Sequence, residues 1–213
     1  MRKLLGIFIF LFTITTYGQK EANFWYFGHK AGLDFSTTPP TAITGELDTF
    51  EGASTISDKQ GNLLFYSDGT NVWSKNNQLM RYSNGSPAND LLGNPSSTQS
   101  ALVIPKPSSS TIYYLFTVGT NRNRGLNYYT IDVSKNNGLG EIIDGPVDLS
   151  GTASNTWSEK VTAVEGKDCD TFWVISTDIN NFYSYKVDKN GVIKTPVTSS
   201  FGQTINTTRF IQF

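Results

Sequence analysis

A strand, turn and strand unit rich in apolar residues recurs three times along the chain, and this repeat limits the possible folds more than any other feature. Each unit joins a short apolar strand, through a polar turn, to a longer strand rich in aromatic residues. The three units cover residues 53–68, 101–117 and 161–177, with a spacing of roughly fifty residues. That spacing matches one blade of a β-propeller, which is a sheet of about four antiparallel strands.

Further alternating segments extend each unit. A third strand is predicted at residues 71–75, 126–133 and 181–187, and an Asn- or Gly-rich turn then leads to a fourth extended segment. Near the start of the chain, residues 23–28 and 32–35 flank a tight turn and predict a hairpin. Ser, Thr and Asn are abundant, whereas the good helix formers Ala and Glu are scarce, so the composition also favours strands and turns.

The predicted fold class is therefore all-β. We expect one domain over residues 20–213, folded as an incomplete β-propeller of about three to four blades of antiparallel strands. The strands that would close the ring have to come from beyond Ile193, and few residues follow it, so we expect the propeller to be truncated at its C-terminus. The alternative is a β-sandwich of two sheets.

The first nineteen residues have the pattern of a secretory signal. Arg2 and Lys3 precede an apolar run from Leu4 to Ile14, which is too short to span a bilayer, and small residues precede a cut after Gly18 or Gln19. We expect residues 1–19 to be a signal peptide. The protein is then exported to the periplasm, the cell surface or the medium, with no membrane insertion after cleavage.

The inventory of reactive side chains is short. His29 is the only histidine and Cys169 the only cysteine, so the usual zinc sites and internal disulfides are excluded by counting. Cys169 stands between Asp168 and Asp170, where neighbouring carboxylates disfavour a reactive thiolate. The chain lacks a glycine-rich phosphate loop, and its net charge of −1 offers no basic surface to nucleic acid. We expect no metal, no cofactor and no nucleic-acid partner.

Acidic residues allow an enzymatic alternative. Glu46, Asp48 and Glu51 fall within one predicted loop, and Asp168 and Asp170 within another. A glycosidase needs only two suitably spaced carboxylates, so a carbohydrate-active enzyme that uses loop carboxylates is the second hypothesis. Such residues also favour tight turns for purely structural reasons.

The main functional hypothesis is a non-enzymatic binding module for a glycan or a protein. Trp157 lies in the Ser-, Asn- and Thr-rich segment 151–158, and we expect it to be an exposed binding aromatic. Asn121, Arg122 and Arg124 form a basic polar loop between strands and are the next candidates.

A string of motifs over residues 23 to 205 resembles a known group of proteins. It is similar to the N-terminal propeller-type region of large Bacteroidetes surface proteins that carry a C-terminal type IX secretion sorting or gliding-motility-associated domain. The motifs that carry this resemblance are Asn23–Gly28, Gly32–Phe35, Ile56–Asp58, Gly61–Gly69, Val72–Lys75, Leu92–Ser100, Pro105–Pro107 and Glu159–Ala163.

The resemblance implies export to the cell surface or the medium and a binding, adhesive or scaffold role without established catalysis. It supplies no functional residue that can be carried over to this sequence. The chain departs from the group by ending at Phe213, where further blades and the sorting domain would follow.

Overall fold

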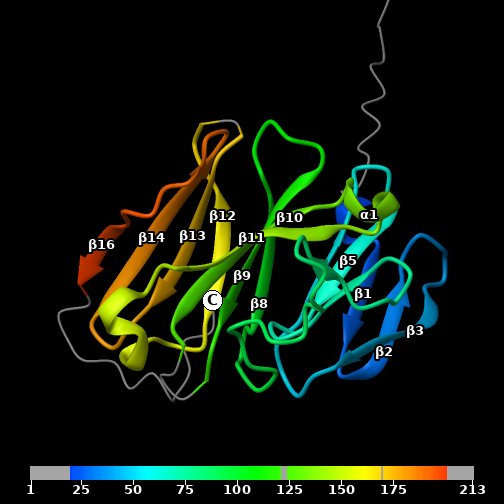
Figure 1. Ribbon diagram of the computed structural model, residues 1–213, viewed down its shortest axis with the longest axis horizontal. Helices are drawn as coiled ribbons and strands as arrows, with labels where there is room; N and C mark the ends of the chain where they lie inside the picture. The colour runs from blue at the N-terminus through cyan, green and yellow to red at the C-terminus, as the bar shows by residue number, and fades with distance from the viewer. Residues whose placement is uncertain (1–19, 121–123, 169, 201–213) are drawn as a thin grey trace, which may run out of the picture.

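The chain folds into four β-sheets that follow one another along the sequence (Figure 1). The computed structural model describes residues 20–120, 124–168 and 170–200. Its helical content in this part of the chain is small: 3-10 helices η1 (Lys20–Ala22) and η2 (Gly151–Thr156), and the short helix α1 (Lys135–Gly138). The mostly β fold agrees with the prediction from the sequence, whereas the predicted signal peptide, residues 1–19, lies outside the described residues.

The first two sheets have three strands each. Sheet 1 has the strand order β1-β2-β3 and sheet 2 the order β4-β5-β6, with all neighbours antiparallel. Their strands are β1 (Phe24–Phe27), β2 (His29–Asp34), β3 (Thr41–Asp48), β4 (Ser54–Ser57), β5 (Leu63–Ser67) and β6 (Val72–Ser74).

The other two sheets have five strands each. Sheet 3 has the order β7-β11-β10-β9-β8, and sheet 4 the order β12-β13-β14-β15 with β16 also paired to β14. Among the strands that the structure describes, only the short β7 runs parallel to its neighbour, β11. The strands are β7 (Arg81–Tyr82), β8 (Ala101–Pro105), β9 (Ile112–Val118), β10 (Leu126–Asp132), β11 (Glu141–Asp148), β12 (Val161–Glu165), β13 (Phe172–Thr177), β14 (Asn181–Asp188), β15 (Gly191–Val192) and β16 (Val197–Ser200).

The three repeated units and the early hairpin are confirmed as strands. One prediction is wrong: the segment that holds Glu46 and Asp48 is not a loop but strand β3. Its burial alternates, with Leu47 fully buried between the two exposed acids, because successive side chains of a strand point to opposite faces. The predicted turn after β10 contains α1, in which Asn136 and Asn137 both have positive φ.

Three hydrophobic clusters join the four sheets in chain order. Tyr26 and Leu47 of sheet 1 meet Tyr66 and Trp73 of sheet 2. The second cluster joins sheets 2 and 3 and includes Phe65, Val72, Leu115, Tyr129 and Ile131. The third joins sheets 3 and 4 and includes Phe116, Tyr128, Val161, Val174 and Val187. The sandwich alternative is wrong, because the described residues form four sheets joined by three clusters rather than two sheets packed face to face.

An edge strand of each sheet lies next to an edge strand of the following sheet. Strand β1 contacts β4, β4 contacts β8, and β8 contacts β12. In sheets 1, 2 and 4 this edge strand is also the first strand of the sheet along the chain, and the later strands are added on one side of it. In sheet 3, β9, β10 and β11 follow β8 in the same way, whereas the earlier β7 pairs with β11 at the opposite edge. The four sheets are therefore arranged in chain order, from blue sheet 1 to orange sheet 4 in Figure 1.

Candidate binding groove

Trp157, the leading candidate from the sequence, is not an exposed aromatic. It is only 2% exposed and belongs to the cluster between sheets 3 and 4. Its indole Nε1 donates a 2.7 Å hydrogen bond to the Ser176 hydroxyl, which in turn donates to the Lys160 carbonyl. The ring stacks on Tyr183 at 4.7 Å between centroids. Trp157 therefore anchors the segment before β12 in the core, and its burial leaves no face for a ligand.

The basic loop is described only in part. Asn121 and Arg122 lie outside the described residues. Arg124 is exposed, with φ of 70°, and its Nη1 lies 3.4 Å from the carbonyl oxygens of both Leu91 and Gly93. These contacts tie the guanidinium to a neighbouring loop of its own chain.

The predicted carboxylates are separated by the fold. Glu46 accepts a 2.9 Å hydrogen bond from the Lys30 ammonium, which raises the pKa of that lysine, and Asp48 pairs with His29. Asp168 and Asp170 line a different cavity, of about 320 Å³, at the turn before β13. Of the predicted acids, Glu51 alone lines a groove of the described residues between sheets 1 and 2.

That groove runs between the first strands of sheets 1 and 2. It has a volume of about 540 Å³ and is open to solvent. All four residues of β1 line it on one side, and the segment from Ala53 to Ile56 lines it on the other. Ala22 and the two acidic residues Glu21 and Glu51 complete the lining.

The alternation of β1 places aromatic rings at this groove. Tyr26 points into the core and stacks on Tyr66 at 4.1 Å, whereas Trp25 points the other way and is 54% exposed. The indole Nε1 of Trp25 donates a 3.0 Å hydrogen bond to the Ala22 carbonyl, and its ring packs against Phe35 at 5.3 Å. The exposed ring is thus held in place by neighbours on both sides.

The two walls of the groove are joined by a direct contact. The backbone N–H of Tyr26 donates a 3.1 Å hydrogen bond to the hydroxyl of Thr55 on β4.

The pKa of the Tyr26 hydroxyl is raised, chiefly by burial and further by Asp34. The phenol therefore stays neutral at ordinary pH.

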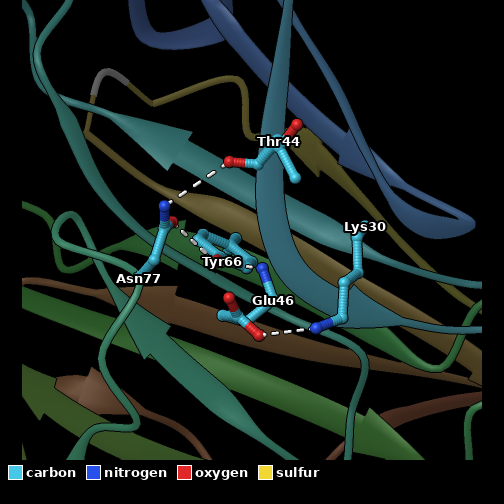
Figure 2. Close-up of polar contacts among 5 residues, drawn as sticks. All are labelled: Lys30, Thr44, Glu46, Tyr66 and Asn77. Atoms are coloured by element: carbon cyan, nitrogen blue, oxygen red, sulfur yellow. Dashed lines mark hydrogen bonds and ion pairs between the residues drawn. The ribbon is translucent and has the colours of Figure 1, made fainter.

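A polar network behind β1 fixes sheet 1 on sheet 2 (Figure 2). The Tyr66 hydroxyl accepts a 2.9 Å hydrogen bond from the Glu46 backbone N–H and donates one of 2.8 Å to Asn77 Oδ1. Asn77 Nδ2 also donates to the Thr44 carbonyl at 3.4 Å. Burial raises the pKa of Tyr66 to about 12, so this bridge keeps its proton.

Gly45 of β3 is required by the same packing. A Cβ at this position would lie 2.5 Å from ring atoms of Tyr26, well inside contact distance. The absence of a side chain on Gly45 lets Tyr26 lie flat between β3 and Tyr66. Gly45 of β3 therefore helps to position the β1 wall of the groove, together with the residues of β1 itself.

The chemistry of the groove is that of a recognition surface. Its charged lining residues are both acidic, and within the described residues no Lys or Arg lines it. An exposed indole, carboxylates and the hydroxyls of Ser54 and Thr55 together suit a ligand with an apolar face and hydrogen-bond donors. No group of three or more His, Cys, Asp or Glu side chains that could hold a metal ion occurs among the residues that the structure describes.

Comparisons with protein-family models, with curated proteins and with solved structures find no match. In the described part of the chain, no helix is both long and apolar enough to traverse a bilayer. The groove is therefore assigned from its own geometry.

Sequence reasoning missed Trp25 as the exposed aromatic. The available signal was the alternation of four consecutive aromatic residues in a short first strand, Phe24–Phe27. In such a strand two of the rings must face away from the core unless another sheet covers them.

Proposed function

We propose that the four sheets are consecutive blades of a propeller-type array. The support is the contact between the edge strands β1, β4, β8 and β12, in chain order, combined with the addition of the following strands on one side of each. In a β-propeller the first strand of each blade faces the central axis, and neighbouring blades pack face to face. The groove between β1 and β4 then lies on the axial side, where blade edges meet.

On this architecture the chain is a non-enzymatic, exported binding module that holds a glycan or protein ligand in the groove. The observation that carries the proposal is the exposed Trp25 ring, held at the edge of a groove that also offers carboxylates and hydroxyls. Pyranose rings and apolar peptide side chains both stack on such a ring. The resemblance to Bacteroidetes surface proteins agrees with this role and with export.

Binding can be measured on a panel of neutral, acidic and amino-sugar oligosaccharides and of short peptides, with the full chain purified after export from a bacterial host. We expect Trp25→Ala to weaken binding of the best ligand roughly tenfold, the equivalent of one lost stacking contact. Glu51→Gln changes the acidic lining without changing its volume and serves as the second groove variant.

Ile143→Ala is the matched control, because Ile143 is 39% exposed on β11, outside the groove lining. The affinity of the Ile143→Ala variant for the best ligand should equal that of the unaltered chain. Binding that survives both Trp25→Ala and Glu51→Gln would place the ligand elsewhere and refute the groove.

The enzymatic alternative keeps one specific observation in its favour. Glu21 and Glu51 line the same groove, so two carboxylates do border a cavity of sufficient size for a sugar chain. Incubation of the full chain with the same oligosaccharides, followed by chromatography of the products, tests it. Hydrolysis that disappears in Glu51→Gln would establish the enzyme, and intact oligosaccharides that remain bound would reject it.

Export has its own test. We expect the chain recovered from the bacterial periplasm or medium to begin near Gln19 or Lys20, after removal of residues 1–19. N-terminal sequencing of the exported protein would reveal an intact Met1 if this expectation is wrong.

A further inference from the structure

A second cavity lies between sheets 2 and 3. Residues 56–60, at the turn that joins β4 to β5, line it on one side. Residues of β8, of β9 and of the turn between them line it on the other side, and Glu21 of η1 borders it. Its volume is about 230 Å³, which suits one small molecule rather than a polymer chain. We call this cavity the inter-sheet pocket.

A buried hydroxyl at the inter-sheet pocket has no partner. Ser57 ends strand β4, is 1% exposed and lines the pocket, and its Oγ makes no hydrogen bond within the part of the chain that the structure describes. An unpaired hydroxyl away from water is unfavourable, and most buried polar side-chain atoms of proteins have a partner. The Ser57 hydroxyl can therefore both donate to and accept from a molecule in the pocket.

The opposite sheet presents a second hydroxyl. Tyr113 of β9 also lines the pocket and is 8% exposed, and its ring packs edge-on against Phe65 at 5.9 Å between centroids. The pKa of the Tyr113 hydroxyl is raised, first by burial and then by the negative charges of Asp58 and Glu21. The phenol is therefore neutral at ordinary pH, and both carboxylates lie within electrostatic reach of it.

The lining of the pocket carries an excess of negative charge. Asp58 accepts hydrogen bonds from the backbone N–H groups of Gln60 and Asn62 and from the Asn62 side chain. Burial opposes ionisation of Asp58, but the hydrogen bonds of its turn outweigh burial and lower the pKa of the carboxyl. Lys59 also lines the pocket, but it is exposed and forms no ion pair with Asp58 or Glu21 among the described residues.

These groups favour one class of small molecule. A primary ammonium is attracted to two carboxylates and can donate three hydrogen bonds. A lysine side chain would bring its ammonium on an apolar stem and leave the hydroxyls of Ser57 and Tyr113 unpaired. An amino sugar carries hydroxyl groups on the ring carbons beside its ammonium, so a single ring offers partners to the carboxylates and to both hydroxyls.

We propose that the inter-sheet pocket binds an amino sugar with a free primary amine. Its ammonium faces Glu21 and Asp58, and its ring hydroxyls pair with Ser57 and Tyr113. This inference goes beyond the ligand groove, because it requires neither Trp25 nor Glu51. It also restricts the ligand, since a neutral N-acetylated sugar loses the charge that the carboxylates attract.

Isothermal titration calorimetry of the full exported chain with the methyl glycoside of glucosamine tests the proposal. The measurement is made at about pH 6, where an amine of this kind is protonated. The N-acetyl form of the same glycoside keeps the ring but not the charge, and Nα-acetyl-lysine amide keeps the ammonium but not the ring. We expect one glucosaminide per chain, with an affinity roughly tenfold or more above that of either control compound.

Two conservative variants locate the ligand. Asp58→Asn keeps a side-chain oxygen for the turn and removes the charge, and Tyr113→Phe removes only the hydroxyl, so each should weaken glucosaminide binding roughly tenfold. The matched controls are Asp132→Asn, a turn carboxylate that bonds the Ser134 N–H, and Tyr114→Phe, whose ring faces sheet 4. Neither control residue lines the pocket, and both controls should bind as the unaltered chain does.

Ser57→Ala separates binding from folding. Because the Ser57 hydroxyl has no partner among the described residues, its removal should weaken glucosaminide binding and leave the urea midpoint unchanged or higher. A lower midpoint with unchanged binding would show that this hydroxyl serves the fold and not a ligand, and would count against the proposal.

Four results would each overturn the proposal: no glucosaminide binding, equal binding of the N-acetyl form, tighter binding of the lysine derivative, or full binding by both Asp58→Asn and Tyr113→Phe. Trp25→Ala separates the pocket from the groove. Glucosaminide binding lost in Trp25→Ala would place the sugar in the groove and overturn the pocket. Binding that depends on Asp58 in a chain whose groove holds no ligand would retain the pocket and refute the groove.

Discussion

Sheet 3 and sheet 1 use similar residues in opposite surroundings. In β9, six of the seven residues are buried, whereas β1 buries only Tyr26 of its four aromatic residues. Sheet 3 has a neighbouring sheet on both faces, and sheet 1 has a neighbour on one. Burial in this fold is therefore decided by the position of a sheet in the row rather than by how apolar its strands are.

The comparison also explains two sequence patterns. A strand covered on both faces is a continuous apolar run, such as Ile112–Val118, and a strand covered on one face alternates, as Thr41–Asp48 does. Four consecutive aromatic residues in the edge strand β1 fit neither rule unless its outer face has a partner.

The largest expected effect contrasts two phenylalanines. Phe116 of β9 is fully buried, and Phe27 of β1 is 42% exposed. We expect Phe116→Ala to lower the free energy of unfolding by about 3–5 kcal/mol, because it leaves a cavity in a closed core. Phe27→Ala should cost about 1 kcal/mol or less in the monomer. Urea unfolding monitored by tryptophan fluorescence gives both values.

The same pair tests whether the outer face of sheet 1 is exposed in solution. A cost of Phe27→Ala nearly as large as that of Phe116→Ala would show that the outer face of sheet 1 is covered in solution. Equal costs at every concentration would contradict the contrast between inner and terminal sheets.

A second effect concerns alkaline pH. Burial raises the pKa of Tyr113, Tyr114, Tyr128 and Tyr129 in sheet 3, and raises that of Tyr66 in sheet 2 to about 12, from an ordinary value of 10.0. A folded-state pKa above the unfolded value favours the neutral phenol in the fold. The resulting stability is complete below about pH 10 and is lost as the pH rises through the folded-state values.

The urea midpoint should therefore fall steeply above pH 10, together with the appearance of tyrosinate absorbance. Ionisation of exposed tyrosines without loss of structure would leave the midpoint flat through pH 12. That result would show that the tyrosines of the inner sheets are not the groups that limit alkaline stability.

A smaller effect is expected at the bridge between sheets 1 and 2. Tyr66→Phe keeps the stacked ring but removes the hydroxyl that bonds the Glu46 N–H and Asn77. We expect a loss of about 1–2 kcal/mol in the free energy of unfolding, because these polar groups lose a partner in a partly buried place. Tyr82→Phe is the matched control, since its hydroxyl makes only an exposed 3.5 Å contact with Asp90. Equal losses for the two variants would refute a special role of the Tyr66 bridge.

Local pattern predicted the strands well because their signals lie within a few residues. The alternation in 53–68, 101–117 and 161–177 corresponds to β4 with β5, β8 with β9, and β12 with β13. Strand β3 was missed because Glu46 and Asp48 resemble loop residues, although each simply occupies the exposed position beside Leu47. The parallel pairing of β7 with β11 joins segments far apart in sequence, and no local pattern reports such a contact.

The candidate site was predicted less well, for a related reason. Trp157 stands in a polar segment that has the composition of a surface loop, yet Ser176, 19 residues later, accepts its indole hydrogen bond inside the core. Trp25 stands in an apolar strand that has the composition of core, yet it is exposed because sheet 1 ends the row. Both outcomes depend on which sheet comes next, which the local sequence does not encode.

The smallest expected effect lies on the rim of sheet 1. The ammonium of Lys30 and the Glu46 carboxylate are 2.9 Å apart, but both side chains are about half exposed, so water and salt screen their attraction. Lys30→Gln should leave the urea midpoint unchanged within error at physiological salt. The hydrogen bond from the Glu46 backbone N–H to the Tyr66 hydroxyl does not involve Lys30 and should remain. A clear loss that shrinks as salt is added would instead show that this exposed ion pair helps to hold β2 on β3. In that case, an exposed ion pair would help to stabilise the terminal sheet, whereas the inner sheets are stabilised by burial on both faces.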